Sequence, residues 1–139
     1  MANNELISAV KAAKRDGNRV YIIGNGGSYA NAMHICNDLL SSGIRAFCLD
    51  PSTLTAFAND YGYETAFERW INICAEKGDL LIALSGSGKS PNILNAIKAA
   101  EEKGMTVYRI FGNERGEDMQ AAEEAQIAIG HQLLRSLRK

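Results

Sequence analysis

The chain has 139 residues, 46% of them hydrophobic and 22% charged, which is the composition of an ordinary globular protein with one core. A formal net charge of −1 argues against a nucleic-acid or membrane-surface partner, and no apolar run is long enough to span a bilayer. The odd number of widely spaced cysteines (Cys36, Cys48, Cys74) argues against disulfides, and the N-terminus lacks a signal peptide. We expect one cytoplasmic domain over residues 1–139.

The first half of the chain predicts two helices, two strands and a glycine turn. Asn3 or Asn4 can cap a first helix that runs to about residue 15. Residues 20–23 read as a buried strand, and after the turn a second helix runs from Tyr29 to about Ser42, with Ser28 as a candidate cap. Residues 44–49 form a second strand, and residues 52–60 fit either a short helix or a loop.

The second half repeats the alternation of strand and helix. A third helix covers about residues 63–76, and a fully apolar third strand covers residues 80–84. A helix from Pro91 to Lys103, a fourth strand over 106–111 and a final helix over 119–137 follow. Strands and helices that alternate through short connections predict an α/β domain with a parallel sheet and helices on both faces.

Two glycine-rich loops follow the first and third strands, Gly24-Asn25-Gly26-Gly27-Ser28 and Ser85-Gly86-Ser87-Gly88-Lys89-Ser90. Both lie at the carboxyl edge of the sheet, where free N–H groups at a helix N-terminus favour a phosphate. We expect no nucleotide cofactor, because the third glycine of a dinucleotide fingerprint would fall at Tyr29. A nucleoside triphosphatase loop is also rejected, because its first glycine would fall at Ala83.

Two pairs of titratable residues lie on predicted helices. His34 and Asp38 are four apart and share a helix face, which fits a metal chelate, an acid/base pair or a simple surface pair. Glu123 and His131 are eight apart, about 12 Å along a helix axis, so they cannot both bind one atom from one straight helix. The segment with Asn59 and Asp60 fits a ligand-facing loop or a helix cap, and composition does not decide.

Taken together, the two glycine-serine loops, Ala32-Met33-His34 and Asn59-Asp60-Tyr61-Gly62 resemble the sugar isomerase (SIS) domain, in its phosphoheptose isomerase group. The resemblance covers most of the chain and implies a three-layer α/β/α sandwich with a parallel sheet of four to five strands. It implies conversion of sedoheptulose 7-phosphate to D-glycero-D-manno-heptose 7-phosphate through an enediol, a step in the heptose biosynthesis of lipopolysaccharide.

The resemblance also implies roles for particular residues. Asp38 stands where the family has its glutamate base, and His131 matches the catalytic histidine. A metal such as Zn²⁺ would be held by His34, Asp38, Glu123 and His131, where the family has a glutamine at the position of Glu123. The residues that would bind the sugar phosphate are Asn25, Gly26, Gly27, Ser28, Asn59, Asp60, Ser85, Gly86, Ser87, Ser90 and Glu123.

Relatives of this kind assemble through subunit contacts, so we expect a homo-oligomer, in particular a tetramer with composite active sites. The alternative is a non-catalytic SIS module that binds a sugar phosphate or a protein such as the replication initiator DnaA. The branch that binds DnaA lacks the acidic and histidine residues at the positions of Asp38 and His131, and this chain retains a carboxylate and a histidine there, which favours an enzyme.

Overall fold

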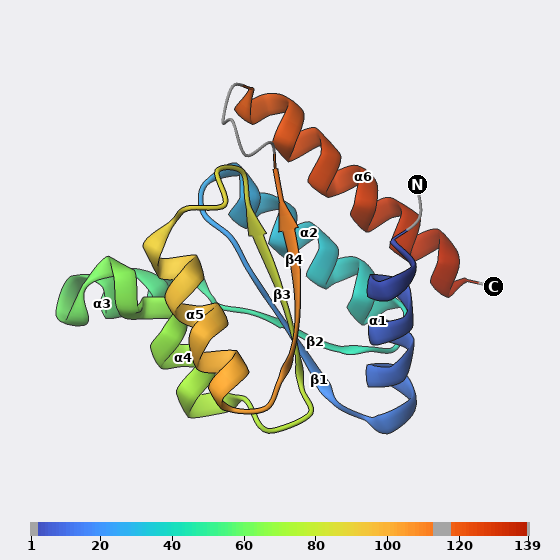
Figure 1. Ribbon diagram of the computed structural model, residues 1–139, viewed down its shortest axis with the longest axis horizontal. Helices are drawn as coiled ribbons and strands as arrows, with labels where there is room; N and C mark the ends of the chain where they lie inside the picture. Colours follow the sequence, from blue (N-terminus) through green and yellow to red (C-terminus); the bar gives the residue numbers. More distant parts are fainter. Residues whose placement is uncertain (1–2, 113–117, 139) are drawn as a thin grey trace.

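A four-stranded parallel sheet lies between two layers of helices in this computed structural model, which describes residues 3–112 and 118–138 (Figure 1). The strands, in spatial order, are β2 (Arg45–Cys48), β1 (Arg19–Ile23), β3 (Leu80–Ser85) and β4 (Thr106–Phe111). One face carries α1 (Asn4–Asp16), α2 (Gly27–Ser41) and α6 (Met119–Leu137). The other face carries α3 (Pro51–Tyr61), α4 (Ala66–Cys74) and α5 (Pro91–Glu102). The predicted three-layer α/β/α sandwich is therefore confirmed, with four strands in the described residues.

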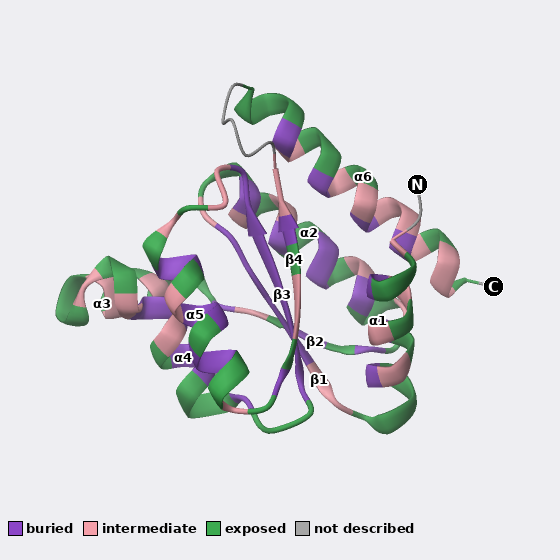
Figure 2. Cartoon of the chain, in the orientation of Figure 1, coloured by how far each residue is buried: buried purple, intermediate pink, exposed green. Residues whose placement is uncertain are grey.

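The core consists of two apolar layers, one on each face of the sheet (Figure 2). All six residues of β3 are buried, and the apolar run over residues 80–84 predicts this for a central strand of a parallel sheet, while the last residue, Ser85, is a buried polar one. No helix in the described residues is long and apolar enough to cross a membrane.

The order of the strands brings the two glycine-serine loops together. The chain leaves β1 toward β2 on one side and returns to β3 on the other, so β1 and β3 flank a topological switch point. Ile23, the last residue of β1, is the register partner of Ala83, which lies near the end of β3. Both loops consequently begin at the same level of the carboxyl edge, where ligands of such sheets bind.

Several predicted helix boundaries are wrong for local reasons. Helix α2 begins at Gly27, so Ser28 lies inside the first turn, and Gly26 occupies the cap position at a φ of 53° that favours glycine. Asn3 occupies the cap position of α1 but does not cap it, because its amide donates to Gln132 (3.4 Å) and its oxygen accepts from Tyr108 (3.1 Å).

The segment that was ambiguous in sequence is helix α3, and Asp50 caps it by accepting from the backbone N–H of Thr53. The helix predicted over residues 63–76 is divided. Its first residues form a 3₁₀ turn, Tyr63–Thr65, that follows Gly62 at a φ of 101°, and the α-helical part ends at Cys74.

Candidate functional site

A small cleft of about 90 Å³ opens between the loops that follow β1 and β3. We call it the serine cleft, and its walls come from both loops and from the start of α6. The lining residues are Asn25, Ser28, Leu84, Ser85, Gly86, Ser87, Ser90, Met119 and Glu123.

The loop over residues 85–90, which we call the serine loop, is held in shape by hydrogen bonds to its own hydroxyl groups. The hydroxyl oxygen of Ser85 accepts from the N–H of Gly88 at 2.9 Å, and that of Ser87 accepts from the N–H of Lys89 at 3.1 Å. Ser90 is the N-cap residue of α5, and its side chain makes no capping hydrogen bond within that helix. The Ser90 hydroxyl is thus not used to cap α5, and Ser90 lines the cleft beside the positive end of the α5 dipole, an arrangement that suits an anion.

A pair of hydrogen-bonded asparagines ties the glycine turn to α5. The side-chain amides of Asn25 and Asn92 exchange two hydrogen bonds of 2.9 and 2.8 Å, and the Tyr63 hydroxyl donates to the same Asn25 oxygen at 2.6 Å. Asn92 is only 1% exposed. This network fixes Asn25 at the mouth of the cleft, and no local sequence pattern links Asn92 or Tyr63 to it.

A second buried network fixes Ser28 against α6. Gln126, which is 1% exposed, donates from its amide to the Ser28 hydroxyl at 3.0 Å and accepts from the amide of Asn31 at 2.9 Å. Asn31 also donates to the backbone carbonyl of Glu123. These hydrogen bonds hold the start of α2 against the middle of α6. No sequence pattern pointed to Gln126.

Glu123 lies over the N-terminus of α2. Its carboxylate occupies the space beside Gly27 so closely that a Cβ at Gly27 would overlap both carboxylate oxygens. A negative charge at a helix N-terminus is favourable by itself. The same charge also lines the serine cleft, where it opposes a bound anion.

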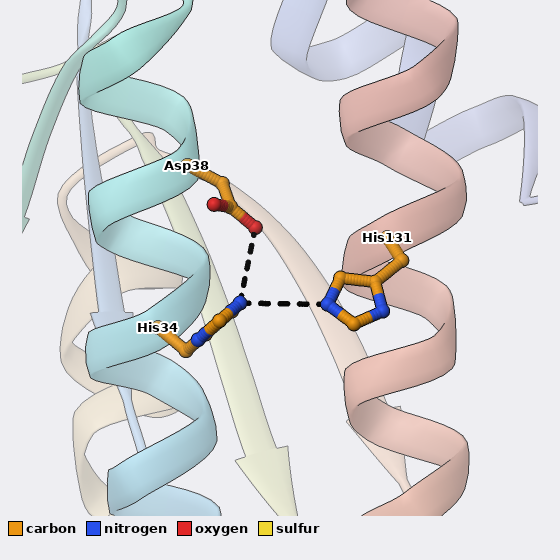
Figure 3. A group of neighbouring side chains, drawn as sticks. All are labelled: His34, Asp38 and His131. Carbon is orange, nitrogen blue, oxygen red and sulfur yellow. Dashed lines mark hydrogen bonds and ion pairs between the residues drawn. The ribbon is translucent and has the colours of Figure 1, made fainter.

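His34, Asp38 and His131 converge between α2 and α6, and we call them the His/Asp/His cluster (Figure 3). The His34 Nε2 lies 3.5 Å from the Asp38 Oδ2 and 3.4 Å from the His131 Nε2. The two rings meet edge to face. Asp38 Oδ2 is buried without a hydrogen-bond partner among the described residues, so this carboxylate is positioned to receive a proton or a cation.

Gly130 allows the two helices of the cluster to approach each other. A Cβ at this position would lie 2.6 Å from the Cγ1 of Ile35, which is closer than real carbon atoms pack. Because Gly130 precedes His131 and Ile35 follows His34, this close contact sets the distance between the two imidazole rings.

The cluster has the donor set of a metal site. Its ligand atoms all lie within 4.8 Å of one another, and two imidazole nitrogens with one carboxylate oxygen suit Zn²⁺ at a site with an open position. The Asp38 Oδ2, which lacks a hydrogen bond in the described residues and has only the 3.5 Å contact with His34, and the approach of the two Nε2 atoms both fit a cation between them. Glu123, the fourth predicted ligand, is not a member of the cluster and lies at the serine cleft.

Asn59 and Asp60, which were also predicted to bind the substrate, lie apart from the serine cleft and from the His/Asp/His cluster. Asn59 and Asp60 are exposed at the end of α3, where the amide of Asn59 donates to the Asp60 carboxylate at 3.1 Å, and neither lines the serine cleft. Their substrate-binding role stays a prediction.

The cysteines are free thiols, and burial raises the pKa of Cys48 to about 12, so this thiol supplies no thiolate at neutral pH.

The fold and the site together define a parallel α/β domain with a small cleft, lined by two glycine-serine loops, at its switch point. The profile of the SIS domain matches residues 3–112. A phosphoheptose isomerase of Burkholderia pseudomallei (strain 1710b) is 39% identical over 158 residues that cover 96% of this chain and 80% of that protein. The chain therefore belongs to the SIS domain family, in its phosphoheptose isomerase group, as the sequence motifs predicted.

Solved structures agree with this assignment. The phosphoheptose isomerase of Neisseria gonorrhoeae superposes with a TM-score of 0.88 at 26% identity, over 97% of this chain and 84% of that one. The phosphoheptose isomerase of Francisella tularensis gives the same TM-score at 25% identity, over 97% and 83% of the two chains.

Proposed function

We propose that this protein is a ketose–aldose isomerase that converts sedoheptulose 7-phosphate to D-glycero-D-manno-heptose 7-phosphate. One observation carries the proposal, namely that the serine cleft and the His/Asp/His cluster lie along the same helix, α2. His34 and Asp38 lie seven and eleven residues beyond Gly27, about 10 and 16 Å along the axis of α2. The substrate would have to bridge this separation between its phosphate and its carbonyl end. Relatives named phosphoheptose isomerase support the choice of substrate.

The serine cleft binds the phosphate in this proposal. Ser87 and Ser90 contribute hydroxyl groups, Gly26 leaves the backbone of the neighbouring turn open to close approach, and the α5 N-terminus contributes its dipole. Neutral donors of this kind bind a phosphate dianion without a basic side chain. The sugar then extends along α2 toward the His/Asp/His cluster, with its carbonyl end near Asp38.

Asp38 acts as the base. Its carboxylate takes the proton from C1 of the ketose, which gives an enediol, and returns the proton to C2 to form the aldose. His131 donates a proton to the former carbonyl oxygen at C2 and accepts one from the hydroxyl at C1, because imidazole exchanges protons near neutral pH. Each proton removed is returned, so the isomerisation balances without an oxidant or reductant.

A divalent metal, Zn²⁺ in particular, fits the His/Asp/His cluster and would be held by His34, Asp38 and His131. When bound, it would supply Lewis-acid stabilisation of negative charge on the sugar oxygens. Metal content by mass spectrometry of the purified protein tests this assignment, with His34→Ala as the variant expected to lose the metal.

We also propose that the protein is a cytoplasmic homo-oligomer, in particular a tetramer, and that residues 1–139 form one domain. Met33 and Leu40 support association, because they are 45% and 53% exposed and seven residues apart on the outer face of α2. A partner subunit in contact there would lie beside the His/Asp/His cluster. Light scattering tests the oligomeric state, and a monomer with full activity would contradict it.

Proton NMR tests the proposed reaction. The purified protein is incubated with sedoheptulose 7-phosphate, and an anomeric signal of the aldose is expected to grow with time. Calorimetry on the same sample measures binding separately. Binding without turnover would instead support a sugar-phosphate-binding SIS module. If the protein shows no binding and no turnover, the substrate assignment is refuted.

A further inference from the structure

A second pocket, of about 340 Å³, lies at the opposite edge of the sheet from the serine cleft. Its walls come from the first residues of β1 and β2 and from α4. The lining residues are Arg19, Tyr21, Arg45, Phe47, Trp70 and Cys74, and we call it the arginine–aromatic pocket. Its volume falls within the range of about 300–1,000 Å³ that is usual for small-molecule sites.

Strand register places two arginines and two aromatic rings on one face of the sheet. Arg19 pairs with Arg45, and two residues further Tyr21 pairs with Phe47. Residues two apart on a strand face the same side, and neighbouring strands lie about 4.8 Å apart. The two guanidinium groups therefore start from adjacent positions beside the aromatic rings.

The aromatic side chains form an ordered wall. Tyr21 stacks on Phe47 with ring centroids 5.7 Å apart, and Trp70 meets Tyr21 edge to face at 5.1 Å. The Tyr21 hydroxyl donates to the backbone carbonyl of Cys74. Phe47 nevertheless remains 38% exposed, because β2 is an edge strand and α4 does not cover it. This open ring is a stacking surface.

The two arginines of this pocket are not neutralised by a carboxylate from the described residues. In the part of the chain that the structure describes, neither Arg19 nor Arg45 takes part in an ion pair. Arg45 donates to the backbone carbonyl of Gly17, and Asp79 accepts from the backbone N–H groups of Arg19 and Glu76. Two cations on neighbouring strands repel each other, and an anion between them would relieve that repulsion.

We propose that the arginine–aromatic pocket binds a planar aromatic ring that carries a phosphate group, as a nucleoside monophosphate does. The ring would stack on Phe47 beside Trp70, and the phosphate would lie between the two guanidinium groups, whose fork geometry suits phosphate oxygens. This site lies at the amino ends of the strands, so it is separate from the serine cleft and does not depend on the proposed isomerase activity.

Trp70 is the only tryptophan of the chain and lines the pocket, so its fluorescence reports binding there. Adenosine monophosphate is the probe, and excitation at the red edge of tryptophan absorption avoids absorption by the base. We expect saturable quenching by adenosine monophosphate, with at least about tenfold weaker effects of adenosine and of inorganic phosphate, because each lacks one half of the recognised ligand.

Arg45→Gln is expected to weaken binding about tenfold, the loss typical of one charge-assisted hydrogen bond. Arg109→Gln is the matched control, since Arg109 is an exposed strand arginine at the other edge of the sheet and pairs with Glu101. A second readout is alkylation of the exposed Cys74, which adenosine monophosphate should slow. The proposal would be overturned if adenosine monophosphate neither quenches Trp70 saturably nor slows the alkylation of Cys74. It would also be overturned if Arg45→Gln binds adenosine monophosphate as tightly as the original protein, or if this face binds only a protein partner.

Discussion

Replacement of Glu123 by glutamine should strengthen the binding of phosphate. The serine cleft has a volume of about 90 Å³, so a phosphate centred in it lies roughly 5 Å from the Glu123 carboxylate, where Coulomb's law gives about 0.8 kcal/mol of repulsion per unit charge even at the permittivity of water. A phosphate with a charge of about −1.5 to −2 then experiences about 1.2–1.7 kcal/mol, which corresponds to a factor of about ten in the dissociation constant.

Calorimetry with inorganic phosphate measures this effect without a contribution from the sugar. Glu124→Gln is the matched control, because it removes the same charge from the neighbouring, exposed position of α6. We expect about tenfold tighter binding for Glu123→Gln, a gain that shrinks at high salt, and little change for Glu124→Gln. Equal or weaker binding by Glu123→Gln would refute the repulsion and would mean that Glu123 takes part in holding the anion.

Three further changes test other parts of the account. Ser87→Ala combined with Ser90→Ala should weaken sugar-phosphate binding in calorimetry while the melting temperature holds, because neither hydroxyl caps α5; unchanged affinity would contradict the cleft assignment. Gly130→Val should lower the free energy of unfolding by about 1–3 kcal/mol in denaturant titration, because its side chain would collide with Ile35. Burial raises the pKa of Cys48 from 9.0 to about 12, so the stability tied to its neutral thiol is present below pH 9 and is lost as pH rises through 12; thermal melts across that range that show no decline would refute this, as would rapid alkylation of Cys48 near neutral pH.

Much of the fold follows from local sequence. The apolar run of β3 predicts its burial on both faces, and the final helix was predicted with the bounds that the structure has. The two glycine-serine loops indicate an anion site, because each directly follows a strand and leads into a helix. Helix starts were less predictable, since Ser28 can cap a helix in principle but bonds to Gln126 across the layer instead.

Contacts between distant segments could not be predicted from one sequence. Asn25 and Asn92 are 67 residues apart, and Ser28 and Gln126 are 98 apart, so no local pattern links them. The axial separation of Glu123 and His131 predicts that the two do not share one atom within a chain, and the cluster found in the described residues contains His131 without Glu123. Only the close packing of α2 and α6 at Gly130 shows that His131, rather than Glu123, joins His34 and Asp38 within one chain.

The central claim is that Asp38 and His131 transfer protons while the serine cleft holds the substrate. The most direct measurement is the rate of aldose formation from sedoheptulose 7-phosphate by the Asp38→Asn and His131→Gln variants, with calorimetry of substrate binding under the same conditions. The account predicts that turnover falls at least about 100-fold in each variant while substrate affinity stays within severalfold of the original. Turnover that persists in either variant, with binding intact, would contradict it.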